Sequence, residues 1–453
     1  MKRKSIKRKS IKGKISSLLC GALVLGLVSA CGTADSGTDT TNTADTVKGG
    51  NGTAEAEDGS SQAEPESGGQ SESERTETQT VTVWHDGDEA IMDVIAAQVN
   101  SELASEHIQI AFEKKTGLTD QLQLYGTDEV NGPDMYFYAH DSLGTFAEMG
   151  ILAPVTDFIS AEDEADLIDM TVEAGTYQGT QYMLPVYYET LIFIYNKELW
   201  EGDVPDTTDG LYDYMAAHTD TEAGTYALVN QHSTAYNAAP FINGFGAYII
   251  DKDANPGLNT DEMKEAVAYN RKFAGLESEG DYDTCNTLFN EQKAAAIIGG
   301  PWLVSGIKDA GISYGIKSLA EFKLPNGSGL APYSGIQGVG ILKYAEKNKK
   351  DAVASVLKAL CNADLGIALA NRSGCAPANA AAYEDTQVAS NEMIMAMKKT
   401  AETAQPMPNI PQMSVMWGPA ESLLAAVNKS GEDIDTAAET YQEQALTAIS
   451  DMQ

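Results

Sequence analysis

Histidine and cysteine are scarce in this sequence, which has only five of each among 453 residues. It contains no CxxC pair and no histidine-rich cluster, so no motif points to a metal ion or another cofactor. Three cysteines lie beyond the first 31 residues, namely Cys285, Cys361 and Cys375. Because three is an odd number, they cannot all pair within one chain, and we expect buried free thiols.

Basic residues are also few, since 30 Lys and Arg stand against 66 Asp and Glu, a formal net charge of −36. Eight of the basic residues lie within the first 14 positions, which contain no acidic residue. The rest of the chain is therefore more acidic still, and such a body repels nucleic acid and anionic lipid headgroups. We expect no nucleic-acid partner and no charged face that holds the protein to a membrane.

The N-terminus has the pattern of a secretory signal. Its basic segment precedes an apolar run that is shorter than the roughly 20 residues of a membrane-spanning helix. The sequence VSAC (28–31) then resembles a bacterial lipobox, in which a lipidated cysteine becomes the mature N-terminus. We predict a signal peptide over 1–30, lipidation of Cys31, and a location on the extracellular face of the cell membrane. An ordinary cleaved signal or an uncleaved anchor is the alternative.

Residues 32–80 contain no aromatic residue and no Leu, Ile or Met. Such a segment cannot bury enough apolar surface to order itself, so we predict a lipidated cysteine and a disordered acidic tether over 31–80. The body that begins at Val81 is too long for one hydrophobic core, which predicts two domains.

The body begins with alternating strand and helix patterns, at 81–84, 89–104 and 107–112. This order predicts parallel strands and an α/β class. More strands are expected at 135–138 and 191–195, and helices at 261–276, 346–361, 363–371, 388–402 and 434–452.

Three polar side chains stand where the first strands end. Ligands of open α/β sheets bind beyond the carboxyl ends of the strands. Asp86 and Asp88 follow the first strand, and Tyr138 ends the strand at 135–138. We therefore take these three residues as candidates for ligand binding.

Five segments, in order, resemble the maltose/maltodextrin-binding protein family. They are VTVWHDGDEA (81–90), GPDMYFYAHDSLGTFAEMGILAPVT (132–156), YYETLIFIYNKELW (187–200), FNEQKAAAIIGGPW (289–302) and MPNIPQMSVMW (407–417). Because their spacing is also family-like, the resemblance covers the whole body.

The resemblance implies a two-lobed periplasmic-binding-protein fold of type II, with sugar bound between lobes that close by hinge bending. The lobes would hold 81–187 with 336–388, and 190–334 with 392–453, joined by three crossings near 187–190, 334–339 and 386–392. It also implies a monomer that binds a malto-oligosaccharide and delivers it to the membrane permease subunits of an ABC importer.

A cleft for a neutral oligosaccharide needs aromatic rings for the C–H faces of the sugar and polar groups for its hydroxyls. The family match places stacking aromatic residues at Tyr138, Tyr236, Tyr282, Trp302 and Trp417. It places hydroxyl-binding carboxylates at Asp88, Asp141 and Glu189, with Asp86 as a further candidate. Asp141 has an alternative role as a helix N-cap, whereas Trp84 is expected in the core.

The sequence also departs from the family pattern. Glu89 and Ser142 replace basic residues, and Ala239, Val304 and Gly418 replace aromatic ones. The exact sugar therefore stays open, and the smaller side chains are expected to leave room for additional sugar rings.

Other classes of function remain as alternatives. An extracellular glycosidase would use two of the predicted carboxylates as an acid/base pair, but no segment resembles an enzyme. His85 and His140 have no Ser or Cys nucleophile motif nearby, so a local structural role is expected for both. We therefore predict a binding protein without catalytic residues, with a different neutral oligosaccharide or a surface adhesin as the remaining alternatives.

Overall fold

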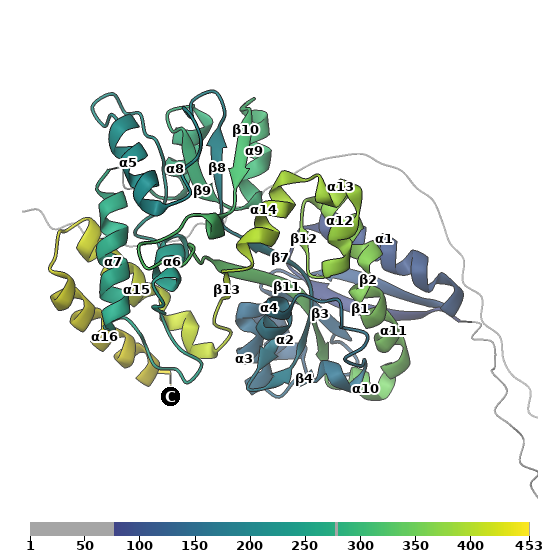
Figure 1. Cartoon of the computed structure of the whole chain (residues 1–453). Helices are drawn as coiled ribbons and strands as arrows, with labels where there is room; N and C mark the ends of the chain where they lie inside the picture. The colour runs from purple at the N-terminus through teal and green to yellow at the C-terminus, as the bar shows by residue number, and fades with distance from the viewer. Residues whose placement is uncertain (1–76, 277–279, 453) are drawn as a thin grey trace, which may run out of the picture. The chain divides into compact units, whose positions relative to one another are not determined.

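Three β-sheets organise residues 77–276 and 280–452, which are the residues that the computed structural model describes (Figure 1). The predicted signal peptide, Cys31 and nearly all of the predicted tether lie outside them. The largest sheet has the strand order β12-β7-β11-β3-β1-β2, with β4 and β13 also paired to β11. Its strands are β1 (Gln79–His85), β2 (Ile108–Lys114), β3 (Met135–Ala139), β4 (Leu152–Ala153), β7 (Met183–Thr190), β11 (Tyr333–Leu342), β12 (Ala376–Pro377) and β13 (Gln405–Pro406).

The predicted strand–helix–strand unit is confirmed, because β1 pairs with β2 in parallel and α1 (Glu89–Glu102) connects them. Helical spacing buries Met92, Ile95 and Val99 on one side of α1. The strand begins two residues earlier than expected, since Gln79 at the end of the predicted tether already pairs with Ile108. Further helices that follow strands of this sheet are α2 (Leu118–Tyr125), α3 (Leu143–Glu148), α4 (Asp169–Ala174), α10 (Ala345–Asn348), α11 (Lys350–Cys361) and α12 (Ala363–Ser373).

A second sheet begins directly after β7. β7 ends at Thr190, whereas β8 starts at Ile192 and pairs antiparallel with β9 and β10. The strands are β8 (Ile192–Asn196), β9 (Ala296–Gly299) and β10 (Tyr314–Lys317), and β5 (Thr176–Tyr177) forms a separate hairpin with β6 (Thr180–Gln181). The chain then returns to the large sheet through β11. The lobe boundaries that the family resemblance implies remain a prediction.

Helices in the second part of the chain pack through aromatic side chains. Phe241 of α6 and Phe273 of α7 lie 5.1 Å apart between ring centroids, and Tyr269 of α7 contacts both rings. This packing fixes the start of α6, which carries Tyr236. The helices here are α5 (Thr208–His218), α6 (Ala235–Gly244), α7 (Asp261–Ala274), α8 (Tyr282–Asn290), α9 (Val304–Asp309), α13 (Thr386–Ala389), α14 (Glu392–Thr400), α15 (Trp417–Asn428) and α16 (Ile434–Ser450).

Two expected helices are each divided in the structure. The segment 346–361 divides at Lys349, whose φ of −143° and ψ of 28° are not helical. The segment 388–402 divides before Asn391, whose side chain accepts hydrogen bonds from the backbone N–H groups of Met393 and Ile394. These bonds satisfy the first N–H groups of a new helix, so Asn391 starts α14 instead of continuing α13.

Lys349 breaks the helical pattern because its side chain ties three segments together. Its Nζ lies 2.7 Å from the carbonyl oxygen of Thr80 and 2.7 Å from Oδ2 of Asp134. The same carboxylate oxygen accepts a hydrogen bond of 2.7 Å from the backbone N–H of Thr82. The buried Asp134 therefore joins β1, the start of β3 and the beginning of α11.

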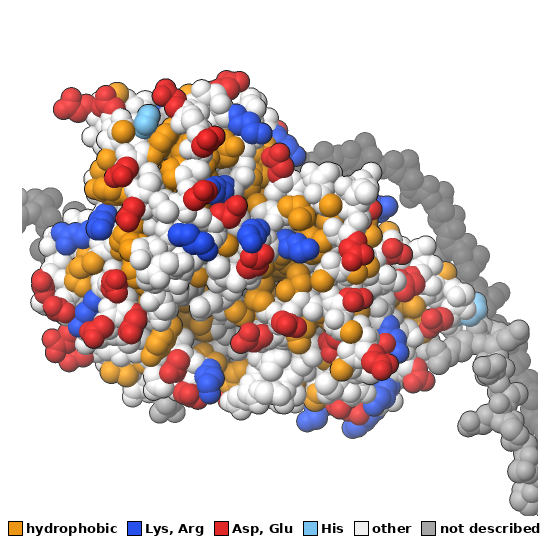
Figure 2. Space-filling view, viewed as in Figure 1, with side chains coloured by type: hydrophobic (Ala, Val, Ile, Leu, Met, Phe, Trp, Pro, Cys, Tyr) orange, Lys and Arg blue, Asp and Glu red, His pale blue; other side chains and the backbone are white. Residues whose placement is uncertain are grey.

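Acidic side chains spread over the drawn face of the molecule, with basic side chains between them (Figure 2). Within residues 77–276 and 280–452, no single helix is long and apolar enough to cross a membrane. The bent pair of α11 and α12 passes that test on length and composition, and both helices bury apolar side chains in the core beneath α1 and the large sheet.

Candidate ligand-binding site

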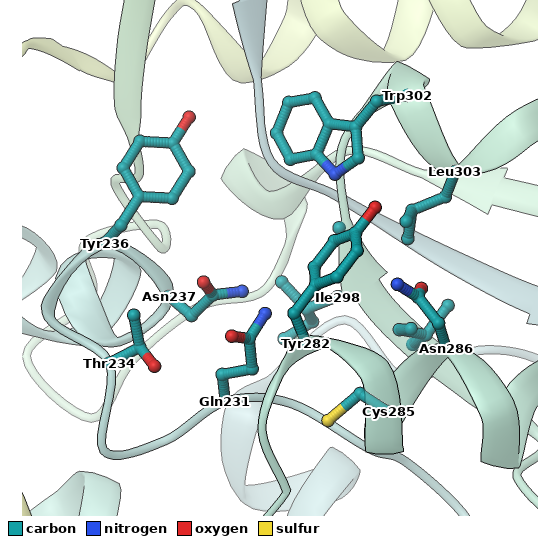
Figure 3. Close-up of a pocket in the computed structure, with 12 residues that line it drawn as sticks. Gln231, Thr234, Tyr236, Asn237, Tyr282, Cys285, Asn286, Ile298, Trp302 and Leu303 are labelled. Atoms are coloured by element: carbon teal, nitrogen blue, oxygen red, sulfur yellow. The ribbon is translucent and has the colours of Figure 1, made fainter. Parts of the chain in front are cut away.

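A pocket of about 350 Å³ opens between the start of α6, the first turns of α8 and the end of β9 (Figure 3). It brings together three of the predicted aromatic residues, Tyr236, Tyr282 and Trp302. In Figure 3 the rings of Tyr282 and Trp302 lie on one side and that of Tyr236 on the other. The other lining residues are Gln231, Thr234, Asn237, Cys285, Asn286, Ile297, Ile298, Gly299 and Leu303.

Two of the aromatic rings present unusually large exposed surfaces. Trp302 is 42 % exposed and Tyr282 is 46 % exposed, although both belong to residue types that normally pack inside. Trp302 belongs to a short 3₁₀ turn (Pro301–Leu303), and its indole lies over the backbone of Gly300, where a Cβ atom would overlap the ring. The Gly-Gly-Pro-Trp sequence thus places the indole against the chain at Gly300, while much of its surface stays exposed and can stack on a ligand.

Local capping fixes the second ring. Tyr282 begins α8, and the side chain of the preceding Asp281 accepts a 2.9 Å hydrogen bond from the backbone N–H of Thr284. Cys285 and Phe289 are buried on the inner side of the same helix. The cap and the buried side chains together set the direction in which Tyr282 leaves the helix.

Amide side chains complete the pocket, and the sequence analysis missed them. Gln231, Asn237 and Asn286 contribute both hydrogen-bond donors and acceptors to the lining. Asn237 is fixed by a 3.3 Å bond from its Nδ2 to Oδ1 of Asn230. A usable signal was present, because Asn237 follows Tyr236 directly and Asn286 lies one helical turn after Tyr282. Among residues 77–276 and 280–452, no Asp, Glu, Lys or Arg lines this pocket.

Glu189 lies near the pocket, on β7 of the large sheet. Burial raises the pKa of Tyr236, and the Glu189 carboxylate raises it further. Burial likewise raises the pKa of Glu189 itself. Among the described residues its carboxylate has no ion-pair or hydrogen-bond partner, so its oxygens remain acceptors for an added donor.

Three of the predicted polar residues gather at the ends of β1 and β3, which are parallel neighbours. Burial raises the pKa of the Tyr138 phenol, with the carboxylates of Asp86 and Asp141 as smaller contributors. Burial also raises the pKa of Asp86, and Asp141 adds to that increase. The carboxyl ends of these strands therefore bring together the Tyr138 ring and the carboxylates of Asp86 and Asp141, and their contact with ligand stays a prediction.

Asp88, not Asp141, is the helix cap among the predicted carboxylates. Asp88 is the N-cap of α1, with its Oδ1 accepting a 2.9 Å bond from the backbone N–H of Ala90. Asp141 lies inside a 3₁₀ turn (His140–Ser142), and the N-cap positions of that turn and of α3 belong to Ala139 and Ser142. The alternative of an N-cap at Asp141 is therefore wrong, whereas Asp88 uses one carboxylate oxygen to start α1.

Trp417 does not line the pocket that holds Trp302. It is the first residue of α15, and it lies edge-on to Tyr333, with 6.4 Å between the ring centroids. Its predicted contact with ligand stays a prediction. Trp84 is 4 % exposed and its place in the core is confirmed, while His85 and His140 are buried as well.

The structure corrects the interpretation of one departure from the family pattern. Ala239 is fully buried in α6 and does not line the pocket, so its small size opens no space for a sugar ring. Gly418 differs, because a Cβ atom there would meet nothing within 4 Å. Cys285, Cys361 and Cys375 are all buried. Cys361 and Cys375 are free thiols, and burial raises the pKa of Cys361 to about 12. No group of metal-binding side chains occurs within residues 77–276 and 280–452.

The chain belongs to the family of bacterial extracellular solute-binding proteins, whose family model matches residues 95–396. Its relatives include the maltotriose-binding protein of Pyrococcus abyssi, which is 28% identical over 81% of this chain and 82% of the relative. The galactooligosaccharide-binding protein of Bacillus subtilis is 28% identical over 80% and 89%. The maltodextrin-binding protein MdxE of the same organism is 29% identical over 74% and 84%.

Solved structures agree on the fold. The cyclo/maltodextrin-binding protein in complex with maltotetraose superposes with a TM-score of 0.75 at 23% identity, covering 83% of this chain and 98% of that one. The maltose-binding periplasmic protein MalE of Listeria monocytogenes in complex with maltose gives a TM-score of 0.71 at 24% identity, covering 82% and 97%. The predicted α/β fold of the type II periplasmic-binding proteins and the predicted family resemblance are therefore confirmed.

Proposed function

We propose that this protein captures malto-oligosaccharides outside the cell and delivers them to an ABC importer, acting as a monomer held to the membrane by lipidated Cys31. The observation that carries this proposal is the composition of the pocket. Exposed rings of Tyr282 and Trp302 stand beside amide side chains, and none of the described lining residues is Asp, Glu, Lys or Arg. Such a surface matches the apolar faces and neutral hydroxyl rims of a sugar chain.

The names of the relatives support the same class of ligand. Two of those compared are a maltotriose-binding and a maltodextrin-binding protein. A third is a galactooligosaccharide-binding protein of similar identity and coverage, which favours galacto-oligosaccharides as the second candidate. Both candidate ligands are neutral, and in the proposed function the protein binds its ligand without cleaving it.

Affinity is expected to increase with chain length from maltose to longer malto-oligosaccharides. The exposed rings of Tyr282 and Trp302 offer stacking surface for an additional sugar ring. One further ring with a stacking or hydrogen-bonding partner adds about 1–3 kcal/mol, roughly 5- to 150-fold in affinity. Isothermal titration calorimetry across maltose to maltoheptaose, on the protein without residues 1–76, measures this series.

Galacto-oligosaccharides of matched length form the control arm of that titration. Tighter binding of the galacto-series would replace the proposed ligand with the second candidate. Equal affinity for maltose and maltotetraose would contradict the length argument.

Raising the salt concentration is expected to change the affinity little, because screening acts on charges and the described residues that line the pocket carry none. Chromatography of the titrated maltotriose tests for cleavage products.

Replacing Cys31 by serine is expected to release the protein from the membrane or to block its processing. The serine hydroxyl cannot carry the thioether-linked lipid. The acidic body repels anionic lipid headgroups, so we propose no other attachment to the membrane. Fractionation of cells that express either form, combined with intact mass, measures the effect. Membrane-bound Cys31→Ser protein with the normal processed mass would exclude lipidation at this position.

A further inference from the structure

His140 is completely buried at the point where β3 ends, and each of its ring nitrogens contacts a different backbone segment. Its Nδ1 lies 3.1 Å from the backbone nitrogen of Ile336 in β11. Its Nε2 lies 2.9 Å from the carbonyl oxygen of Met407. A backbone N–H only donates and a carbonyl only accepts, so Nδ1 accepts from Ile336 and Nε2 carries the proton. These partners select one neutral tautomer.

The segment that His140 contacts is Gln405–Pro411, which we call the strap. It pairs in parallel with β11 at Gln405 and Pro406, and the backbone N–H of Met407 lies 3.4 Å from the carbonyl oxygen of Ser334. Pro406, Pro408 and Pro411 lack backbone N–H groups. The strap therefore forms few ladder hydrogen bonds of its own, and side chains hold much of it in place.

Asn409 provides the second attachment of the strap. Its Nδ2 donates to the carbonyl oxygens of Ala174 at 3.0 Å and Thr176 at 2.8 Å. Its own carbonyl oxygen accepts a 2.9 Å bond from the backbone N–H of Gly144. A Cβ atom at Gly144 would overlap that oxygen, so the strap approaches α3 as closely as glycine permits.

His140 is connected to two residues that are predicted to contact ligand, Asp141 and Trp417, so its hydrogen bonds bear on binding. Asp141 follows His140 directly, and the strap leads through a 3₁₀ turn (Pro411–Val415) to Trp417 at the start of α15. We infer that His140 is a positioning residue of the ligand site, whose Nε2–H bond to Met407 holds the strap on β11 and thereby sets the place of Trp417. The inference rests on the proposed function, and it adds a residue that does not itself contact ligand.

The protonation of His140 agrees with this role. Burial lowers the pKa of the imidazole, although the neighbouring Asp141 and the backbone partners oppose the decrease. The neutral ring is the form that can both accept at Nδ1 and donate at Nε2. The hydrogen bonds of His140 to Ile336 and Met407 therefore stay formed at neutral pH.

Two substitutions separate the two bonds of the ring. In His140→Asn, the amide oxygen replaces Nδ1 toward Ile336, but the side chain is too short to reach Met407. In His140→Gln, the amide nitrogen replaces Nε2 and keeps the bond to Met407. We expect about tenfold weaker binding of maltotetraose by His140→Asn, and binding within about twofold of the original by His140→Gln. Asn409→Ala should also weaken binding. His218 is exposed, so His218→Asn serves as the control.

Hydrogen exchange provides a measurement that needs no ligand. The backbone N–H groups of Gln405 and Met407 should exchange faster in His140→Asn than in His140→Gln or in the unchanged protein. If the two variants exchange or bind alike, the selective role of the Nε2–H bond is wrong. If exchange differs but affinity does not, His140 holds the strap without positioning the site, which also overturns the inference. If the unchanged protein binds no oligosaccharide, the proposed function is wrong. The hydrogen-exchange rates would still decide whether the Nε2–H bond of His140 holds the strap.

Discussion

Replacement of Trp302 by alanine is expected to lower affinity for every malto-oligosaccharide while leaving the fold intact. The indole is 42 % exposed, so removing it takes away little buried contact in the free protein. In the complex it would lose both stacking and the burial of an aromatic face, which we expect to cost about 1.5–3 kcal/mol, roughly 10- to 150-fold in affinity. Isothermal titration calorimetry with maltotetraose measures the loss.

A matched pair of variants sharpens this prediction. Leu199→Ala removes another partly exposed apolar side chain outside the pocket and should bind as the unchanged protein does. Gly300→Ala keeps the indole but places a Cβ atom where the ring lies, so the ring must move. We expect Gly300→Ala to weaken binding as well. Full affinity in Trp302→Ala would remove Trp302 from the site, and full affinity in Gly300→Ala would show that ring orientation is unimportant.

Replacement of Lys349 by methionine is expected to cause a large loss of stability. The methionine keeps most of the apolar stem, but it leaves the buried Asp134 carboxylate with the N–H of Thr82 and without its cationic partner. Breaking a buried pair costs about 3–5 kcal/mol, and because the Lys349 side chain is partly exposed we expect about 2–3 kcal/mol. Urea-induced unfolding followed by circular dichroism measures the difference.

The neighbouring lysine provides the control. Lys350 lies 3.6 Å from Glu346 in an exposed pair, so Lys350→Met should change stability by no more than about 0.5 kcal/mol. Asp134→Asn should cost less than Lys349→Met, because the amide oxygen still accepts from Thr82 and Lys349 can reach water. Equal stability of Lys349→Met and Lys350→Met would mean that the pair contributes nothing beyond a surface contact.

Much of the fold was predictable because its signals are local. The alternation of apolar residues identifies β1, and the helical spacing of Met92, Ile95 and Val99 identifies α1. Of the two divided helices, one is divided by the local N-cap at Asn391 and the other by a side chain that acts at a distance. The division at Lys349 depends on a contact with Asp134, more than 200 residues away in the chain, and local periodicity contains no trace of it.

The candidate site was predictable where a distinctive side chain carries the chemistry. Tyr236, Tyr282 and Trp302 were predicted from the family resemblance, and all three line one pocket in the structure. Amides were harder to find, since Gln and Asn are ordinary surface residues, and only the fold shows that Gln231 and Asn286 face the same space. Their contact with ligand, like that of the aromatic rings, awaits the titrations above.

The strand order of the large sheet has a consequence for when the protein can fold. β11 lies between β7 and β3, yet it begins at Tyr333, long after β7 ends at Thr190. A chain synthesised from its N-terminus must therefore wait for β11 before this sheet can close, and such long-range pairing is slow. Until β11 is made, β1, β2 and β3 can pair with one another, but β3 and β7 lack the strand that joins them. For a protein that we propose to be exported, this delay gives the predicted signal peptide time to engage the export machinery before the sheet closes. The order of strands thus favours export of the chain before the large sheet is complete.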